Sequence, residues 1–194
     1  MTDLKTLLAD LTSGDEPRAE SAAVQFVSFG KKGLYALAAL TASEDPDHRW
    51  WALRALTEFE EPRVRNLLLL ALNDPNPGVQ ACAALGLRLH PNEAAIPDLL
   101  RLLGNEDKLL SRLGRDALAG LGTAATPHLI PLLEEETTPH TVKLEAVRAL
   151  AEIEDPASIS LLFKLSQSGS GLLTHWAEVG LERMGVGMVF FAPE

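Results

Sequence analysis

The chain has 194 residues, of which 46% are apolar and 23% are charged, and its formal net charge is −10. Because nucleic acids and anionic membrane surfaces are themselves negative, this charge disfavours both as partners. There is one cysteine, no secretory leader after Met1 and no apolar run of about 18 residues. The sequence therefore predicts a cytoplasmic protein with neither an internal disulfide nor a membrane span.

Apolar residues recur at helical spacing along the whole chain, which predicts an all-α protein. Residues 1–12 are expected to form an N-terminal capping helix. Five helical hairpins are then expected, at residues 15–42, 44–73, 74–105, 106–134 and 135–167. Residues 168–185 add the first helix of one more repeat, and the apolar residues 186–194 form a tail that folds back as a cap or docks onto a partner or a second copy. We expect a single domain over 1–194, a right-handed α-solenoid of about six hairpins.

A small residue anchors the first helix of each repeat. The anchors lie 29 to 34 residues apart and are Ala22, Ala52, Ala83, Ala117, Ala146 and Ala177. Four residues later stand Phe26, Leu56, Leu87, Leu121, Leu150 and Leu181, on the same helix face. The second helices show a matching register thirteen residues after the anchor, at Tyr35, Arg65, Ile96, Ile130 and Ile159. Arg65 is the outlier of this register, although the stem of its side chain can still cover apolar surface. The other positions are the predicted core.

Helix starts are marked by Asp-Pro pairs. Asp45, Asp74 and Asp155 each precede a proline, which predicts that their carboxylates act as N-caps. Cys82 stands one residue before an anchor and is expected to pack as a small hydrophobe.

The repeat resembles the short HEAT-like repeats of bacterial proteins, the type also found in phycobilisome (bilin) lyase subunits. The resemblance covers about residues 1 to 185, and the residues that carry it are Asp45-Pro46, Arg49, Ala52, Ala55-Leu56, Glu61-Pro62-Arg63, Asp74-Pro75, Ala83, Leu87, Ala146, Ala149-Leu150 and Asp155-Pro156. It implies an armadillo-type fold. Because such repeats serve many unrelated roles, it implies less about activity.

The first candidate site is the run His48-Arg49-Trp50-Trp51-x-x-Arg54. Adjacent helical residues point about 100° apart, so both tryptophans cannot share the buried stripe. Trp51 has the same register as Trp176, which leaves Trp50 as the candidate for exposure. A tryptophan flanked by Arg49 and Arg54 has the composition of a binding hot spot. Alternatively, both tryptophans pack between layers and Arg49 ties down a neighbouring turn.

The second candidate site is the surface lined by the second helices, which is normally the concave one. Its solvent-facing positions are Ala36, Leu40, Asn66, Leu70, Pro97, Arg101, Pro131, Glu135, Ser160 and Lys164. The first two repeats present a mostly apolar groove here, and the last three present alternating charge. Leu40, Asn66, Leu70 and Arg101 are the candidate partner-binding residues on this surface.

No catalytic motif, cofactor fingerprint or metal-ligand spacing stands in the sequence, so we expect a protein that is not an enzyme and holds no cofactor. The leading hypothesis is a scaffold or adaptor that binds a protein or peptide on its concave face. The alternative is a bilin-lyase-like subunit or other chromophore-handling protein; the run Arg49, Trp51, Ala52, Arg54, Ala55 and Leu56 matches one in bilin lyase subunits. A third possibility, a base-excision glycosylase built from HEAT-like repeats, needs a basic groove, which the acidic composition disfavours.

Overall fold

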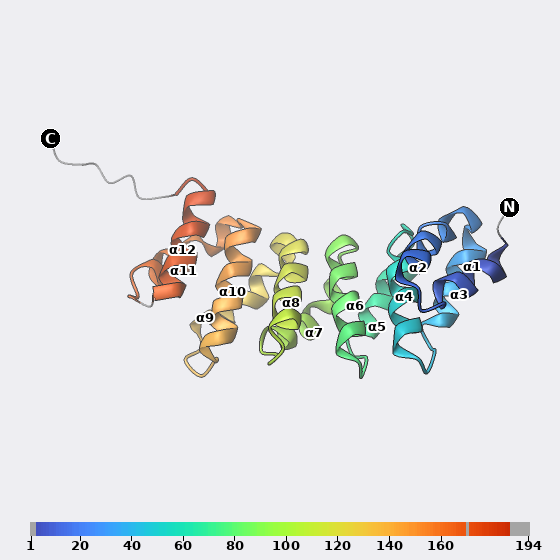
Figure 1. The fold of residues 1–194 in the computed structure, drawn as a ribbon. Coiled ribbons are helices and arrows are strands. Elements are labelled where there is room, and N and C mark those ends of the chain that lie inside the picture. Colours follow the sequence, from blue (N-terminus) through green and yellow to red (C-terminus); the bar gives the residue numbers. More distant parts are fainter. Residues whose placement is uncertain (1–2, 170, 187–194) are drawn as a thin grey trace. The chain divides into compact units, whose positions relative to one another are not determined.

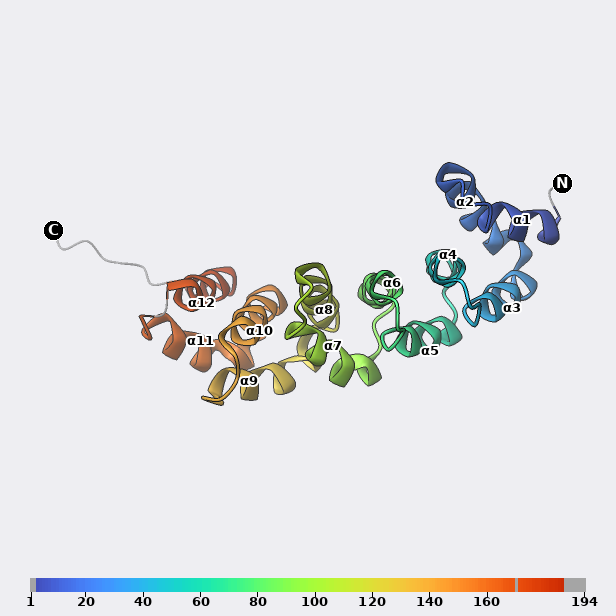
Figure 2. The same cartoon turned by 60° about the horizontal axis from the view of Figure 1, so that its bottom comes forward.

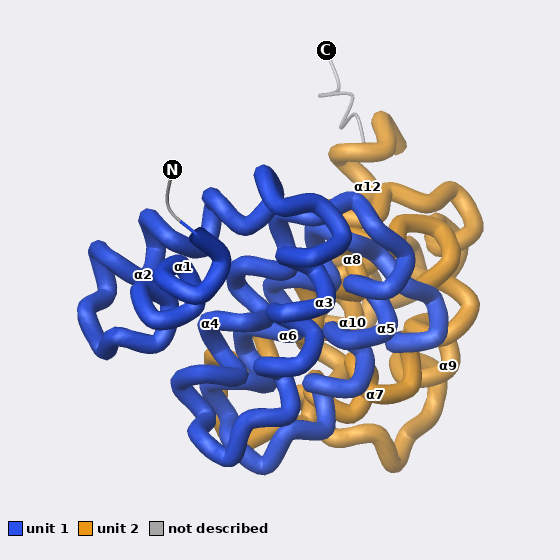
Figure 3. Tube along the Cα trace, turned by 90° about the vertical axis from the view of Figure 1, so that its right-hand side faces the viewer, with its two compact units in different colours: residues 1–95 blue, residues 96–194 orange. Residues whose placement is uncertain are grey.

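The structure is a computed structural model that describes residues 3–169 and 171–186 (Figure 1). Within these ranges the regular structure is entirely helical, with twelve α-helices and four short 3-10 helices. The predicted all-α class is confirmed. The helices divide into two compact units, Met1–Ala95 and Ile96–Glu194 (Figure 3).

Unit 1 contains the capping helix and the helices of the first repeats. Its α-helices are α1 (Leu4–Leu11), α2 (Glu16–Ala23), α3 (Lys31–Leu40), α4 (Pro46–Leu56), α5 (Pro62–Ala71) and α6 (Pro77–Leu89). The 3-10 helices η1 (Phe26–Phe29) and η2 (Glu93–Ala95) lie in its connections. The first helices of the repeats, α2, α4 and α6, contact one another in sequence order, while α3 packs on α4 and α5 packs on α6.

Unit 2 repeats the same arrangement. Its α-helices are α7 (Ile96–Leu103), α8 (Lys108–Gly120), α9 (Thr126–Glu134), α10 (His140–Ile153), α11 (Ile159–Ser166) and α12 (Gly171–Arg183). The 3-10 helices are η3 (Gly122–Ala124) and η4 (Pro156–Ser158). The first helices α8, α10 and α12 form one row, and α7, α9 and α11 form a second row behind it (Figure 2). Stacking helical hairpins in this way is the predicted α-solenoid architecture, because each hairpin buries its apolar stripes only against its neighbours.

The anchor positions lie in the core, as predicted. All six anchor alanines are buried. Four residues after the anchor, Phe26, Leu56, Leu87, Leu150 and Leu181 are buried too, and Leu121 is half-buried. A small side chain at a buried position lets neighbouring helices approach closely, which is consistent with the burial of every anchor alanine.

The second-helix register is less uniform than the sequence predicts. Ile96 is buried, but Tyr35 at the same register is 54% exposed, so its predicted core position is wrong. The Tyr35 ring instead lies under the Arg63 guanidinium, with 5.4 Å between that group and the ring centroid. This cation–π contact gives the ring a partner at the surface.

Two of the three Asp-Pro caps form as predicted. Asp45 accepts a hydrogen bond from the backbone N–H of Asp47, and Asp155 accepts one from Ala157. Asp74 is not the cap of α6; Asn76 takes that place and accepts from the N–H groups of Gly78 and Val79. The prediction failed because the Asp74 carboxylate lies in the preceding turn and binds Arg49.

Close helix approach in unit 2 depends on Gly114. A Cβ atom at this position of α8 would lie 2.7 Å from Leu102 Cβ on α7 and 3.2 Å from the Leu99 carbonyl oxygen. Glycine therefore lets α8 pack directly on α7, the second helix of the preceding repeat. The predicted tail, residues 186–194, falls outside the described residues except for Val186.

Candidate functional site

The two adjacent tryptophans lie on α4 and contact each other. The ring centroids of Trp50 and Trp51 are 4.8 Å apart and the rings meet edge to face at 83°. Both side chains are half-buried, so the structure does not divide them into one exposed and one buried ring. Trp51 lines a hollow of about 280 Å³ beside Asp45 and Asp47.

Arg49 joins two turns of unit 1. Its Nε and Nη2 atoms donate to the two carboxylate oxygens of Asp74, each at 2.7 Å, and its Nη1 donates to the carbonyl oxygens of Ser43 and Glu44. The hydrogen bond to Asp74 raises the pKa of Arg49, and Arg49 lowers the pKa of Asp74. This geometry is that of the structural alternative considered above, in which Arg49 ties down a neighbouring turn.

Arg54 is likewise engaged within unit 1. It pairs with Glu20 on α2 and with Glu58, whose Oε1 is 2.6 Å from Arg54 Nη1. Burial alone would lower the pKa of Arg54, but the two carboxylates outweigh it and the pKa lies above its ordinary value. Arg54 thus stays charged and stabilises the contact between α2 and α4.

The candidate residues on the second helices differ in exposure. On α5, Leu70 is 72% exposed and Asn66 is exposed, whereas Leu40 at the end of α3 is half-buried. Arg101 lies in unit 2, on α7, and its Nη2 is 3.2 Å from Asp98 Oδ1. Within unit 1, the apolar surface at these positions is therefore mainly Leu70.

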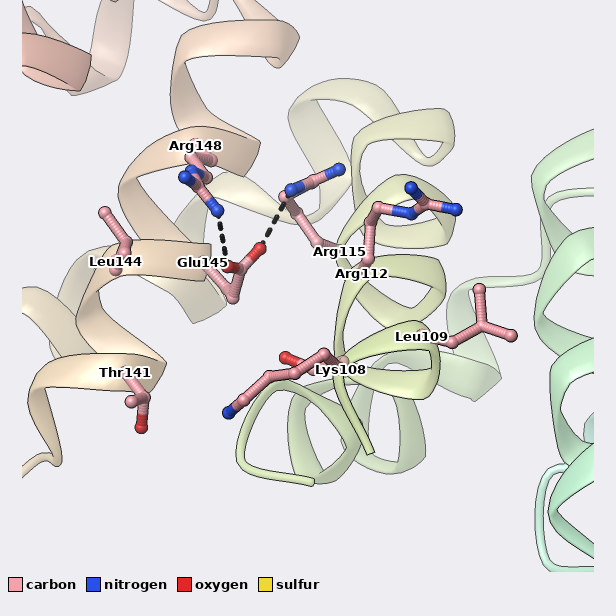
Figure 4. A pocket seen from close by; sticks show the side chains of 9 residues that line it. Lys108, Leu109, Arg112, Arg115, Thr141, Leu144, Glu145 and Arg148 are labelled. Atoms are coloured by element: carbon pink, nitrogen blue, oxygen red, sulfur yellow. Dashed lines mark hydrogen bonds and ion pairs between the residues drawn. The ribbon is translucent and has the colours of Figure 1, made fainter. Parts of the chain in front are cut away.

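Sequence reasoning missed a hollow on the first-helix row of unit 2. It has a volume of about 530 Å³ and lies between α8 and α10 (Figure 4). The side chains that line it are Lys108, Leu109, Ser111, Arg112 and Arg115 from α8, and Thr141, Leu144, Glu145 and Arg148 from α10. Four of them are cationic and one is a carboxylate, in a chain whose net charge is −10. The hollow therefore has the opposite charge to the protein as a whole.

The positive side chains of α8 form one stripe. Lys108, Arg112 and Arg115 stand at positions i, i+4 and i+7, which share a helix face. Like charges at this spacing destabilise a helix, and a cation in the first turn opposes the helix dipole. Among the described residues, Lys108 and Arg112 have no hydrogen-bond or ion-pair partner, and both are exposed. The like charges of this stripe are therefore not arranged to stabilise α8.

Glu145 lies between Arg115 and Arg148 in the wall of the hollow (Figure 4). Its Oε2 is 2.9 Å from Arg115 Nη1 and its Oε1 is 2.8 Å from Arg148 Nη1, so one carboxylate holds two guanidinium groups from different helices. Arg115 also pairs with its neighbour Asp116. Burial opposes the charge of Arg115, but Asp116 and Glu145 outweigh it and raise its pKa. Arg115 therefore stays charged in the hollow.

A second hollow, of about 520 Å³, shares Arg115 and Arg148 with the first and continues to α12. Trp176 on α12 lies under Arg148, with 5.0 Å between the guanidinium and the ring centroid. Within residues 3–169 and 171–186, no atom accepts a hydrogen bond from the buried Nε atom of Arg148. Arg183 completes this wall and donates to the Ala151 carbonyl oxygen at 3.3 Å. Arginine and tryptophan side by side are the residue types that dominate protein interfaces.

The described part of the chain contains no group of three or more histidine, cysteine or carboxylate side chains that could hold a metal ion. None of its helices is long and apolar enough to span a membrane. Cys82 is buried, as predicted, and burial raises the pKa of its thiol to about 12, so the thiolate nucleophile does not form near neutral pH.

Known families match two parts of the sequence. Residues 35–119 match the family described as HEAT repeats, and residues 142–167 match the family described as PBS lyase HEAT-like repeat. The chain is a HEAT-like repeat protein. No curated protein matches it.

Solved structures of repeat proteins share the fold of this HEAT-like protein. The complex of CpcE and CpcF of phycocyanin lyase from Nostoc sp. PCC7120 is 23% identical over 95% of this chain and 78% of that one, with a TM-score of 0.56. A designed armadillo repeat protein in complex with the peptide (KR)4 is 17% identical over 94% of this chain and 100% of that one, with a TM-score of 0.53. An engineered protein is 23% identical over 96% and 98%, with a TM-score of 0.55. At these identities the similarity shows the fold alone.

Proposed function

We propose that this protein is a non-enzymatic scaffold that binds a protein or peptide, and that the partner docks at the hollow between α8 and α10. The observation that carries the proposal is the cationic stripe of α8, which lines a hollow of ligand-binding size. Within the described part of the chain, Lys108 and Arg112 of this stripe have no ion-pair partner. A repeat array leaves a long face free for recognition, and a designed armadillo protein of the same fold class is complexed with a peptide.

Photo-crosslinking tests this proposal at single-residue resolution. A photoreactive amino acid replaces Leu109, at the rim of the hollow, or Phe163, an exposed apolar residue of α11 that lies outside it. We expect a discrete adduct from position 109 in cells, and its loss when Lys108→Glu and Arg112→Glu are added. Identical adducts from positions 109 and 163, or adducts that persist after charge reversal, would contradict the proposal.

A second docking surface is proposed on α5, around Asn66 and Leu70. Its support is that Leu70 exposes 72% of its surface although it is apolar. Leu70→Glu should leave the melting temperature nearly unchanged while weakening partner capture. If Leu70→Glu unfolds unit 1, the residue belongs to the core and this surface is not a docking site.

The second candidate function is that of a bilin-lyase-like, chromophore-handling subunit. It is favoured by the PBS lyase HEAT-like match and by the edge-to-face pair of Trp50 and Trp51, which is half-buried and offers aromatic surface to a planar ligand. Titration with a linear tetrapyrrole should then quench tryptophan fluorescence, and Trp50→Leu should reduce the quenching. Equal quenching of wild type and Trp50→Leu would argue against a chromophore site there.

A further inference from the structure

The hollow between α8 and α10 contains a carboxylate of the protein itself, that of Glu145. Two arginines bind it by charge-assisted hydrogen bonds, as they would bind the carboxylate of a ligand. Figure 4 shows Arg115 and Arg148 reaching Glu145 from two different helices. The Glu145 side chain is only 14% exposed, so these charge-assisted hydrogen bonds are made in a partly desolvated site. Glu145 therefore shows that these two arginines can hold a carboxylate between them.

The repeat register shows why a carboxylate is required. Arg148 stands two residues after its anchor alanine, and Arg115 stands two residues before the preceding anchor. For the anchors Ala22 and Ala52 of unit 1, the same pair of positions holds Glu20 and Arg54, which pair directly. In unit 2 both positions are arginine, so the two side chains repel each other unless an anion lies between them.

Glu145 alone does not balance the charge of this hollow. Lys108 and Arg112 stand at its rim, and Figure 4 draws no interaction from either to the other lining residues. Leu109 and Leu144 add apolar surface to the walls. A carboxylate-bearing ligand that also carries an apolar side chain matches both features.

We propose that this hollow takes an acidic peptide segment of a partner protein. One carboxylate of the segment replaces that of Glu145 between Arg115 and Arg148, and another pairs with Arg112. The inference rests on the proposed scaffold function and adds the chemistry of the occupant. A peptide fits better than a nucleic acid, since the charge of −10 repels a long polyanion but leaves this short cationic stripe accessible to a few carboxylates.

Fluorescence anisotropy with a defined probe tests the inference. The probe is a short labelled peptide of glutamates with one central leucine, and its twins carry glutamine or lysine in place of glutamate. We expect the glutamate peptide to bind the full chain and the two twins not to bind. Lys108→Gln/Arg112→Gln, on the exposed rim, should weaken binding about fivefold or more.

Glu145→Gln provides the sharper test. If Glu145 competes with the ligand, this variant should bind the glutamate peptide about three- to tenfold more tightly. Glu136→Gln is the matched control, because it removes the same charge from an exposed turn of unit 2 outside the hollow, and it should change affinity less than about twofold. Unchanged or weaker binding by a folded Glu145→Gln variant overturns the exchange of carboxylates, and unchanged binding by the rim variant overturns the site.

The remaining outcomes separate this inference from the function on which it rests. Crosslinking from position 109 without binding of the glutamate peptide overturns the acidic ligand and leaves the scaffold function standing. Preferred binding of the lysine peptide, or displacement of the glutamate peptide by a single-stranded oligonucleotide at lower concentration than by unlabelled peptide, also overturns it. Absence of both crosslinking and peptide binding overturns both proposals.

Discussion

The cationic stripe of α8 predicts a variant that is more stable than the wild type and binds less. The change is Lys108→Gln/Arg112→Gln, which removes two exposed charges and keeps the length and polarity of the side chains similar. If these residues served folding, their loss would destabilise unit 2. If they serve the proposed binding instead, their loss should relieve repulsion within the helix.

The expected gain follows from the placement of the charges. Lys108 and Arg112 form one like-charge pair and Arg112 and Arg115 form another, each destabilising by about 0.2–0.5 kcal/mol. Lys108 is also the first residue of α8. A cation at this positive end of the helix dipole destabilises the helix by about 0.3–1 kcal/mol. Asp116 attracts Arg112 but is already bound to Arg115, so it offsets only part of this sum. We expect the free energy of unfolding to rise by about 1 kcal/mol.

Thermal unfolding followed by circular dichroism measures this gain. A rise of about 1 kcal/mol corresponds to roughly 2–4 °C in melting temperature for a chain of this size. The gain should shrink at about 1 M salt, because the Debye length falls to about 3 Å. The control is Lys164→Gln in the last turn of α11, where a cation is favourable, so this variant should be unchanged or slightly less stable. A double variant less stable than wild type would refute the argument that the stripe exists for binding.

Three further predictions concern stability and reactivity. Gly114→Ala should lower the free energy of unfolding by roughly 1–2 kcal/mol in chemical denaturation, because overpacking against Leu102 exceeds the gain in helix propensity. Cys82 should react with a thiol reagent at pH 8 only as fast as unit 1 opens, since burial raises its pKa to about 12; rapid labelling of the native protein would contradict this. The pKa of Asp74 is lowered by Arg49, so its stabilising effect is complete above the ordinary value of 3.8 and is lost as the pH falls through the lower folded-state pKa. Asp74→Asn should therefore lose less stability than wild type in an acid titration.

The core could be predicted from the sequence because one small residue recurs in every repeat. Alanine stands at the anchor of each first helix, and each anchor alanine is buried. Such a constraint repeats with the fold and is visible as a period. Tyr35 and Asp74 could not be placed in this way, because their positions depend on single partners, Arg63 and Arg49, that the period does not specify.

The candidate site was harder to predict because it departs from the repeat. Trp50, Arg49 and Arg54 stood out by composition, yet the structure shows that both arginines pair with carboxylates of unit 1. The signal for the hollow was present as three cations at helical spacing on α8. It carried little weight in the sequence because the partner helix α10 was needed to show that they face a cavity.

The register also suggests how to read such sites in related arrays. Positions two before one anchor and two after the next meet across neighbouring first helices, as Glu20 and Arg54 do. Opposite charges at these positions form an ion pair that stabilises the contact between two repeats. Such a pair leaves no uncompensated charge for a ligand to bind. Like charges at these positions, as at Arg115 and Arg148, weaken the contact between the two first helices. The repulsion is relieved when a carboxylate of the protein or of a ligand lies between them. An array that keeps a repulsive pair therefore retains a site where an external carboxylate can contribute to stability, and binding there should raise the melting temperature of the folded protein.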